Sequence, residues 1–115
     1  MNPETKLQNL ILVALSEAGC TVWRVETAGA WLGRQIHREG NTVTLTNARM
    51  LTTGLCKGGS DIIGIAPCGR FLAIEVKTKT GRPTKDQLRF IEAVNRAGGI
   101  AGIARSVDDA LQLIA

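Results

Sequence analysis

The sequence contains no tyrosine, and its aromatic side chains are limited to two tryptophans and two phenylalanines. These four residues are Trp23, Trp31, Phe71 and Phe90. Proteins that bind single-stranded nucleic acid stack successive bases on several aromatic rings. The composition therefore does not favour a stacking platform for single strands.

Cysteine and histidine are also scarce. The three cysteines, an odd number, include no CxxC pair, and the single histidine, His37, is distant from them in sequence. A structural zinc ion needs four clustered cysteine or histidine ligands. The sequence thus argues against a zinc site and indicates reduced thiols in a cytosolic protein.

Long apolar segments are missing as well. The apolar run Leu10–Leu15 is far shorter than the ~20 residues that a membrane-spanning helix requires. We see no basic stretch followed by a cleavage site, so we expect no signal peptide. The chain has 115 residues, of which 44% are hydrophobic, and we expect one domain over residues 1–115.

The charge balance is moderately basic. The formal net charge is +4 at pH 7, and the isoelectric point is about 9.3. Such values suit a polyanionic partner, but many proteins share them. The charge therefore permits binding to nucleic acid without indicating it.

The most informative segment is the apolar run Ile62–Ile74, which Pro67-Cys68-Gly69 interrupts. Proline and glycine at this point predict a tight turn between two buried strands. A turn centred on Cys68 pairs residues that are equally distant from it. This pairing places Asp61 opposite Glu75, with β-carbons about 5 Å apart. Lys77 follows Glu75 by two residues and therefore projects from the same face.

Two carboxylates and an ammonium group on one face suit a hard divalent cation beside a phosphate. Mg²⁺ is usually held by one or two carboxylates, with water and substrate phosphate as further ligands. The backbone carbonyl of Val76 could add an oxygen ligand, and Lys77 could stabilise charge on the phosphoryl oxygens. The alternative is a surface strand end at which Asp61 and Glu75 form salt bridges with Lys77.

The remaining sequence alternates helices and strands, which predicts an α/β fold. We expect an exposed hairpin around residues 39–41 and a loop over Asn47–Cys56. The other expected elements are a helix from Pro3 to Gly19, a strand Cys20–Glu26, a helix from Thr84 to about Ala97, a strand Ile100–Ala104 and a helix Val107–Ile114.

Two further polar residues have alternative interpretations. Glu4 lies about 50° from the centre of its helix's apolar stripe, counting about 100° per residue, and therefore points near the packed face. The alternative is an acidic residue that is simply favoured at a helix N-terminus. Gln87 shares the apolar stripe of its own helix with Phe90, Ile91 and Val94. The segment Thr84–Gln87 also has the form of a capping box, which is the alternative for Gln87.

The order of these motifs resembles a known nuclease family. Gly59-Ser60-Asp61 followed by Ile74-Glu75-Val76-Lys77 resembles the D…E-x-K signature of the PD-(D/E)xK nuclease superfamily. Serine, rather than proline, precedes Asp61. More narrowly, the chain resembles the VRR-NUC (virus-type replication-repair nuclease) family. The segments that carry this resemblance are Val22–Val25, Gly58–Gly64, Ile74–Lys77, Gly81–Gln87 and Ala97–Ala101.

The resemblance implies a restriction-endonuclease-like core, a mixed β-sheet flanked by α-helices. It implies a phage or bacterial endonuclease that uses Mg²⁺ or Mn²⁺ to cut branched DNA, such as Holliday junctions or flaps, in DNA repair. Asp61 and Glu75 would hold the metal with Glu4 as a further acid, while Lys77 and Gln87 would act in catalysis. The resemblance also implies a homodimer, for which Leu12, Val13 and Trp31 are candidate interface residues.

Candidate DNA contacts flank the acids on both sides. They are Lys57, Gly58, Gly59 and Ser60 before Asp61, and Lys79, Arg82 and Lys85 after Lys77. Glycines let the backbone approach a phosphate closely, although a plain turn needs them too. Two rival functions stay open, a non-catalytic DNA-binding module on the same fold and a small scaffold protein whose acids form only salt bridges.

Overall fold

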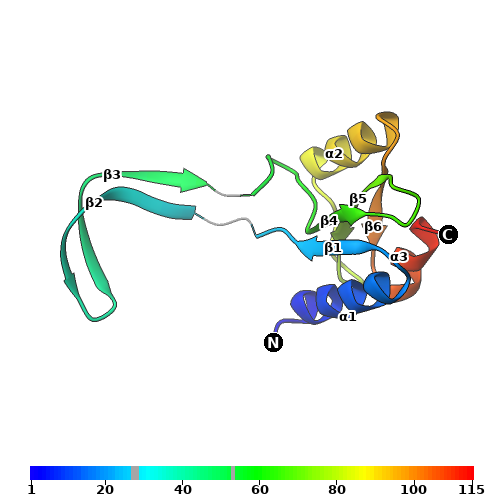
Figure 1. Ribbon diagram of the computed structural model, residues 1–115, viewed down its shortest axis with the longest axis horizontal. Helices are drawn as coiled ribbons and strands as arrows, with labels where there is room; N and C mark the ends of the chain where they lie inside the picture. The colour runs from blue at the N-terminus through cyan, green and yellow to red at the C-terminus, as the bar shows by residue number, and fades with distance from the viewer. Residues whose placement is uncertain (27–28, 53) are drawn as a thin grey trace.

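Four short strands form the central sheet of the computed structural model, which describes residues 1–26, 29–52 and 54–115 (Figure 1). In spatial order they are β1 (Thr21–Arg24), β4 (Ile62–Ile65), β5 (Phe71–Val76) and β6 (Ile100–Ala104). β4 pairs antiparallel with β1 and β5, whereas β6 runs parallel to β5. A parallel pair needs a crossover, which here contains helix α2 (Lys85–Arg96).

Helices cover both faces of this sheet. Helices α1 (Pro3–Glu17) and α3 (Val107–Leu113) pack on one face, where Ile11, Leu15, Ile62, Ile74 and Ala110 form the larger core cluster. Helix α2 packs on the other face, as Figure 1 shows. The predicted mixed sheet flanked by helices is confirmed. No helix within the described residues is both long and apolar enough to cross a membrane.

The central hairpin has the predicted register. Ile62 pairs with Ile74 and Ile65 with Phe71, as a turn centred on Cys68 requires. Successive side chains of β4 and β5 point to opposite faces, and both faces are covered, so both strands are apolar almost throughout. Gly69 has φ of +89°, a conformation that glycine adopts without steric cost. The sequence pattern alone therefore fixes which residues face each other at the open end.

Side-chain caps begin α1, α2 and α3. Asn2 accepts hydrogen bonds from the backbone of Glu4 and Thr5, and Ser106 accepts one from Asp109. The expected strand Cys20–Glu26 is shorter, with only Thr21–Arg24 paired in the sheet. The expected last helix ends at Leu113, one residue early, within the usual uncertainty of helix ends.

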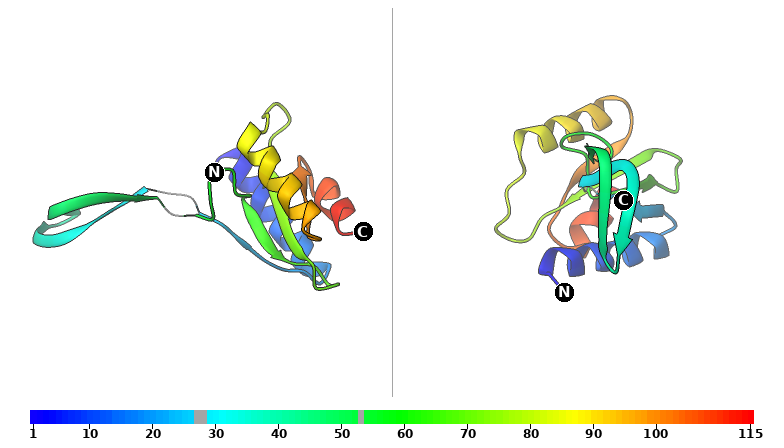
Figure 2. Two further views of the ribbon diagram at one scale, coloured as in Figure 1. Left: turned by 90° about the horizontal axis from the view of Figure 1, so that it is seen from above. Right: turned by 90° about the vertical axis from the view of Figure 1, so that its left-hand side faces the viewer.

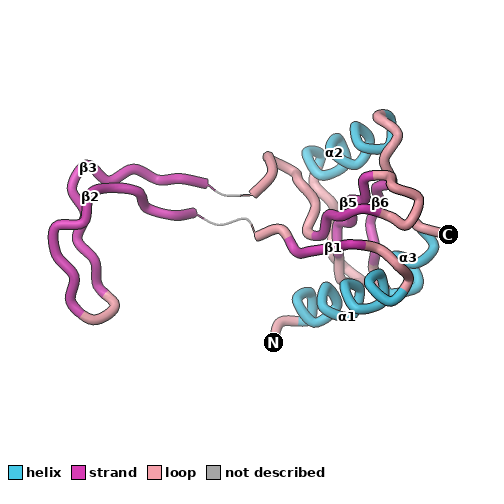
Figure 3. The backbone as a smooth tube through the Cα atoms, in the orientation of Figure 1, coloured by secondary structure: helices cyan, strands magenta, loops and turns pink. Residues whose placement is uncertain are grey.

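A second sheet contains only two strands, β2 (Gly29–Glu39) and β3 (Thr42–Thr52), and we call it the β2–β3 arm. Figure 3 shows the arm extending away from the core, and the view from above in Figure 2 shows the same direction. The radius of gyration is 17.1 Å. A compact chain of this length would have about 13 Å. The elongated shape therefore comes from the arm.

The expected turn of this hairpin is confirmed, but the expected loop over Asn47–Cys56 is wrong for residues 47–52. The pairing shifts between Leu32 and Arg34 and again between Gln35 and His37. Asn47, at the first shift, has φ of 53°. Such bulges break the period of two by which a strand is recognised. The extension of β3 past Asn47 was therefore hidden from a pattern-based reading.

Candidate active site

Asp61, Glu75 and Lys77 meet at one edge of the central sheet. Asp61 directly precedes β4, and Glu75 and Lys77 lie at the end of β5. Asp61 Oδ2 accepts a hydrogen bond of 2.9 Å from the backbone N–H of Val76, and Lys77 Nζ lies 3.6 Å from Glu75 Oε1. The structure thus brings together the three groups that the hairpin register predicted to be neighbours.

Glu75 is a buried carboxyl group in an electrostatically unfavourable position. The residue is 2% exposed, and its Oε2 atom is buried without a hydrogen-bond partner. Burial raises the pKa of Glu75 to about 8, and the negative charge of Asp61 adds to this effect. Lys77 lowers this pKa in part, and Glu4 raises it. Glu75 therefore needs a proton or a cation for its charge to be balanced.

These properties fit a divalent cation beside the two carboxylates. A cation-binding site that lacks its cation has these two features: a buried carboxylate oxygen with no hydrogen-bond donor, and a strongly raised pKa of that carboxyl group. Across residues 1–26, 29–52 and 54–115, no three acidic, cysteine or histidine side chains form a metal-binding group. Glu4 thus influences the charge of Glu75 but does not complete a ligand cluster. Two carboxylates are sufficient for Mg²⁺, which keeps several waters.

Gln87 completes the capping box of α2 and also contacts the buried carboxyl group of Glu75. The side-chain oxygen of Gln87 accepts a hydrogen bond from the backbone N–H of Thr84. The backbone N–H of Gln87 donates to the Thr84 hydroxyl, which completes the capping box. Its side-chain amide also donates to Glu75 Oε1 over 3.0 Å. The start of α2 is therefore joined to the buried carboxyl group by one side chain.

The segment before Asp61 packs against α2 more than it faces solvent. Gly58 has φ of +83°, and a β-carbon there would lie 2.4 Å from the backbone of Asp86. Ser60 is only 2% exposed. The glycine is therefore explained by close packing, and the predicted contact of Ser60 with DNA does not fit its burial. Lys57 remains exposed and forms an ion pair of 3.4 Å with Asp86.

Three candidate DNA-contacting cations are exposed after β5: Lys79 and Arg82 in the loop that leads to α2, and Lys85 at the first position of α2. Arg105, directly after β6, donates from Nη1 to the carbonyl oxygens of Thr78 at 2.7 Å and Gly81 at 2.6 Å. Sequence reasoning missed Arg105, because only the parallel pairing of β5 and β6 brings it to this loop. Arg105 thereby orders the backbone that carries the cations.

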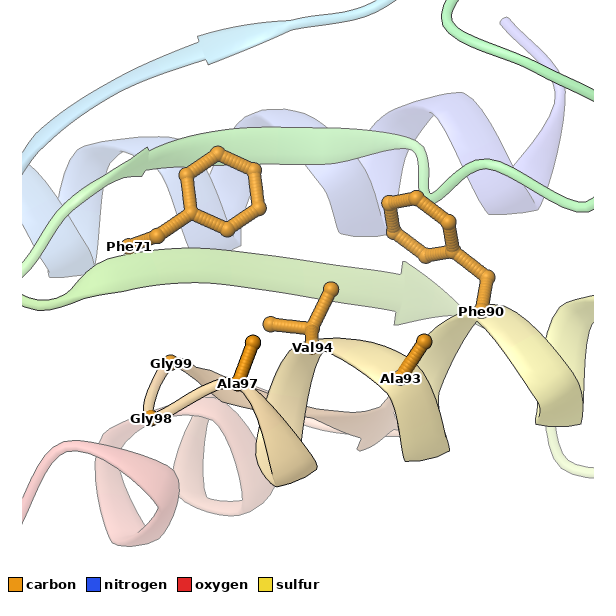
Figure 4. Close-up of a pocket in the computed structure, with 7 residues that line it drawn as sticks. All are labelled: Phe71, Phe90, Ala93, Val94, Ala97, Gly98 and Gly99. Atoms are coloured by element: carbon orange, nitrogen blue, oxygen red, sulfur yellow. The ribbon is translucent and has the colours of Figure 1, made fainter.

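A separate pocket of about 360 Å³ lies at the other end of α2 (Figure 4). Phe71 of β5, Phe90 and Val94 of α2, and Ala97 directly after α2 are among the residues that line it. No charged side chain contributes to its lining. The pocket is therefore unsuited to phosphate or a metal ion, and the acidic edge of the sheet is the better candidate for chemistry.

The central mixed sheet thus carries Asp61, Glu75 and Lys77 together at one edge. The model of the VRR-NUC domain family matches residues 3–108, so the chain belongs to that family. A solved structure described as a VRR_NUC domain is similar over 99% of this chain and 96% of its own, with a TM-score of 0.59 and 21% sequence identity. That likeness establishes the fold. No curated protein matches the sequence. Membership of this family implies a nuclease that acts on DNA.

Proposed function

We propose that this protein is an endonuclease that requires Mg²⁺ or Mn²⁺ and hydrolyses phosphodiester bonds in branched DNA. The observation that carries the proposal is the buried Glu75 carboxyl group, which Asp61, Lys77 and Gln87 adjoin at one edge of the sheet. Burial, together with the charge and the side-chain hydrogen bond of Asp61, raises the pKa of Glu75 to about 8, so the pair of carboxyl groups lacks the positive charge that a divalent ion would supply. The surroundings of Glu75 thus favour function over a purely structural role.

Asp61 and Glu75 would hold the divalent ion, with the Val76 carbonyl as a further candidate ligand, while Glu4 would add negative charge near the ion. When bound, such an ion polarises a phosphoryl oxygen and lowers the pKa of a water molecule. The Asp61 carboxylate is oriented by its hydrogen bond from the Val76 N–H. This hydrogen bond engages Oδ2, so Oδ1 of Asp61 would be the oxygen that binds the cation.

Lys77 would stabilise the negative charge that develops on the phosphoryl oxygens, or position the attacking water. Its side chain is only 16% exposed, so its ammonium group is held beside Glu75 in a partly desolvated place. Charge interactions in such places are stronger than in water. Gln87 would act by holding the Glu75 carboxyl group and by orienting water.

Substrate positioning would depend on the exposed cations near the site. Lys79, Arg82 and Lys85 would contact phosphates, with Lys57 and the Gly58-Gly59 backbone on the other side. Contacts of this kind position a duplex without reading its sequence. A preference for branched DNA would suit a homodimer that presents two such sites to one junction.

A substrate panel tests this proposal. We expect a labelled four-way junction or flap to be cut in Mg²⁺ or Mn²⁺, a plain duplex to be cut less, and EDTA to stop all cleavage. Glu75→Ala should remove the activity in every case. Binding of the junction by the wild type without any cleavage would instead support a non-catalytic DNA-binding module.

Replacement of Gln87 by glutamate separates its two roles. Glutamate also completes a capping box, so Gln87→Glu should keep the melting temperature of the protein close to that of the wild type. It removes the amide donor to Glu75 and adds a negative charge, so we expect cleavage to fall at least about tenfold. Circular dichroism and junction cleavage measure the two effects. Unchanged cleavage in Gln87→Glu would limit Gln87 to helix capping.

A further inference from the structure

Trp23 is a large aromatic residue of the central sheet that the core leaves half exposed. It lies within β1 and pairs with Ile63 of β4, yet it is 49% exposed. Helix α2 packs over β5 and β6, whereas β1 is the edge strand on the far side of β4 (Figure 1). About half of the Trp23 surface is therefore available to a ligand.

Trp23 lies on the same face of the sheet as the candidate active site. Successive side chains of a strand alternate between faces, and directly paired residues share a face. Trp23 and Val25 therefore project with Ile63 and Asp61. The backbone N–H of Val25 donates to the carbonyl oxygen of Asp61 over 2.8 Å, which extends the pairing of β1 with β4 as far as Asp61. Val25 and Ile63 both pack in the core cluster on the α2 side, in agreement with this assignment.

The spacing between Trp23 and Asp61 matches that of neighbouring nucleotides. The two residues are diagonal neighbours on β1 and β4, and the β-carbons of such neighbours are about 7–8 Å apart, within reach of an aromatic side chain. Successive bases of a DNA strand are about 3.4 Å apart along the helix axis. A base in contact with Trp23 would thus lie about two nucleotides from a phosphate held at Asp61 and Glu75.

The surroundings of this ring favour a nucleic acid over a protein as its ligand. Exposed cations are placed before β4 and after β5, namely Lys57, Lys79, Arg82 and Lys85. Proteins that hold unpaired nucleotides combine such cations with an aromatic side chain on which a base stacks. Trp23 provides the aromatic surface beside the candidate metal site.

One ring serves one base and not a long single strand. Phe71, the other half-exposed aromatic residue on this face, is four residues before Glu75 on β5. It is therefore about 13 Å from Glu75 along the strand. A base inside a continuous duplex is stacked on its neighbours, and removal from the stack costs free energy. A branch point, where the stack is interrupted, presents a base face at much lower cost.

We propose that Trp23 stacks on one base at the branch point of the DNA and thereby makes the site selective for branched over continuous duplex. This inference rests on the proposed function, because it concerns the substrate of the same site. The sheet holds Trp23 in place through its pairing with β4. The aromatic surface is therefore present before DNA binds.

The fluorescence of Trp23 tests the proposal without a change at this residue. The chain contains two tryptophans, so Trp31→Phe leaves Trp23 as the single one. In EDTA, a flap with an unpaired base at its branch point should quench the emission of Trp23. A continuous duplex of the same length should leave it nearly unchanged when fluorescence anisotropy of a label on the DNA shows that the duplex is bound.

Substitutions separate stacking from apolar contact. Trp23→Leu keeps an apolar side chain without a ring and should weaken binding of the flap at least about tenfold, as loss of one stacked base does. Trp23→Phe keeps a ring and should restore most of the affinity. Binding of the continuous duplex should change less than about twofold in both variants. Phe71→Leu, a matched substitution at the far end of the same face, should bind the flap as the wild type does.

Four results would overturn the inference: equal quenching by both DNAs, no quenching by either, wild-type affinity of Trp23→Leu for the flap, and equal losses in Trp23→Leu and Phe71→Leu. None of these measurements needs cleavage. A protein that gives the expected quenching and affinities but cuts no DNA would contradict the proposed nuclease alone. A nuclease whose Trp23→Leu variant prefers branched DNA as strongly as the wild type would contradict this inference alone.

Discussion

Replacement of Lys77 by alanine is expected to lower junction cleavage by about 10² to 10³-fold. The ammonium group lies 3.6 Å from Glu75 Oε1 and is largely shielded from water. Loss of one preorganised group that stabilises developing charge costs about this factor in other hydrolases. Single-turnover cleavage of a labelled four-way junction measures the change directly.

Binding of the metal should persist in this variant, because Lys77 is not a ligand in the proposed site. Lys6→Ala is the matched control, since it removes the same charge from an exposed position on α1. It should cleave at the wild-type rate. Full activity in Lys77→Ala would contradict the mechanism, whereas equal losses in both variants would indicate a general effect of net charge.

Replacement of Glu75 by glutamine is expected to stabilise the protein in EDTA at alkaline pH. The pKa of Glu75 is about 8 in the folded protein, against an ordinary value of 4.5. Between these values the folded state holds a proton that the unfolded state has lost. The free energy of unfolding therefore falls as pH rises from 4.5 to 8.

Glutamine keeps the shape of the side chain but cannot ionise. Thermal unfolding in EDTA should show similar melting temperatures for Glu75→Gln and the wild type at pH 5. At pH 8.5 the variant should melt at least several degrees higher, since about 1 kcal/mol corresponds to 4–8 °C in small domains. Added Mn²⁺ should raise the melting temperature of the wild type but not that of the variant. Glu17→Gln, an exposed substitution of the same kind, should follow the wild type throughout.

The core of the site was predictable because it depends on local patterns. The turn at Cys68 determines the register of β4 and β5, and this register alone places Asp61 opposite Glu75. The capping box of α2 was visible as Thr84–Gln87, and it holds the amide of Gln87 beside the sheet. Each of these features depends on residues that are close in sequence, or on one hairpin.

Other features required the tertiary structure. Ser60 is buried, and Gly58 is needed, because α2 packs over the loop that precedes Asp61. Arg105 reaches the loop after Lys77 only through the parallel pairing of β6 with β5. The full length of the β2–β3 arm was hidden by its two bulges. In these cases the deciding partner is distant in sequence, where composition and periodicity carry no signal.

Calorimetric titration of Mn²⁺ into the wild type and Glu75→Gln at pH 7 tests the central claim, that Asp61 and Glu75 form a cation site, most directly. The folded protein holds a proton on Glu75 at this pH, because its pKa is about 8. Mn²⁺ should therefore bind the wild type with release of about one proton, seen as a heat that varies with the ionisation enthalpy of the buffer. Glu75→Gln should bind weakly and release no proton. Absence of binding by the wild type, or equal affinity and proton release in the variant, would contradict the assignment of this site.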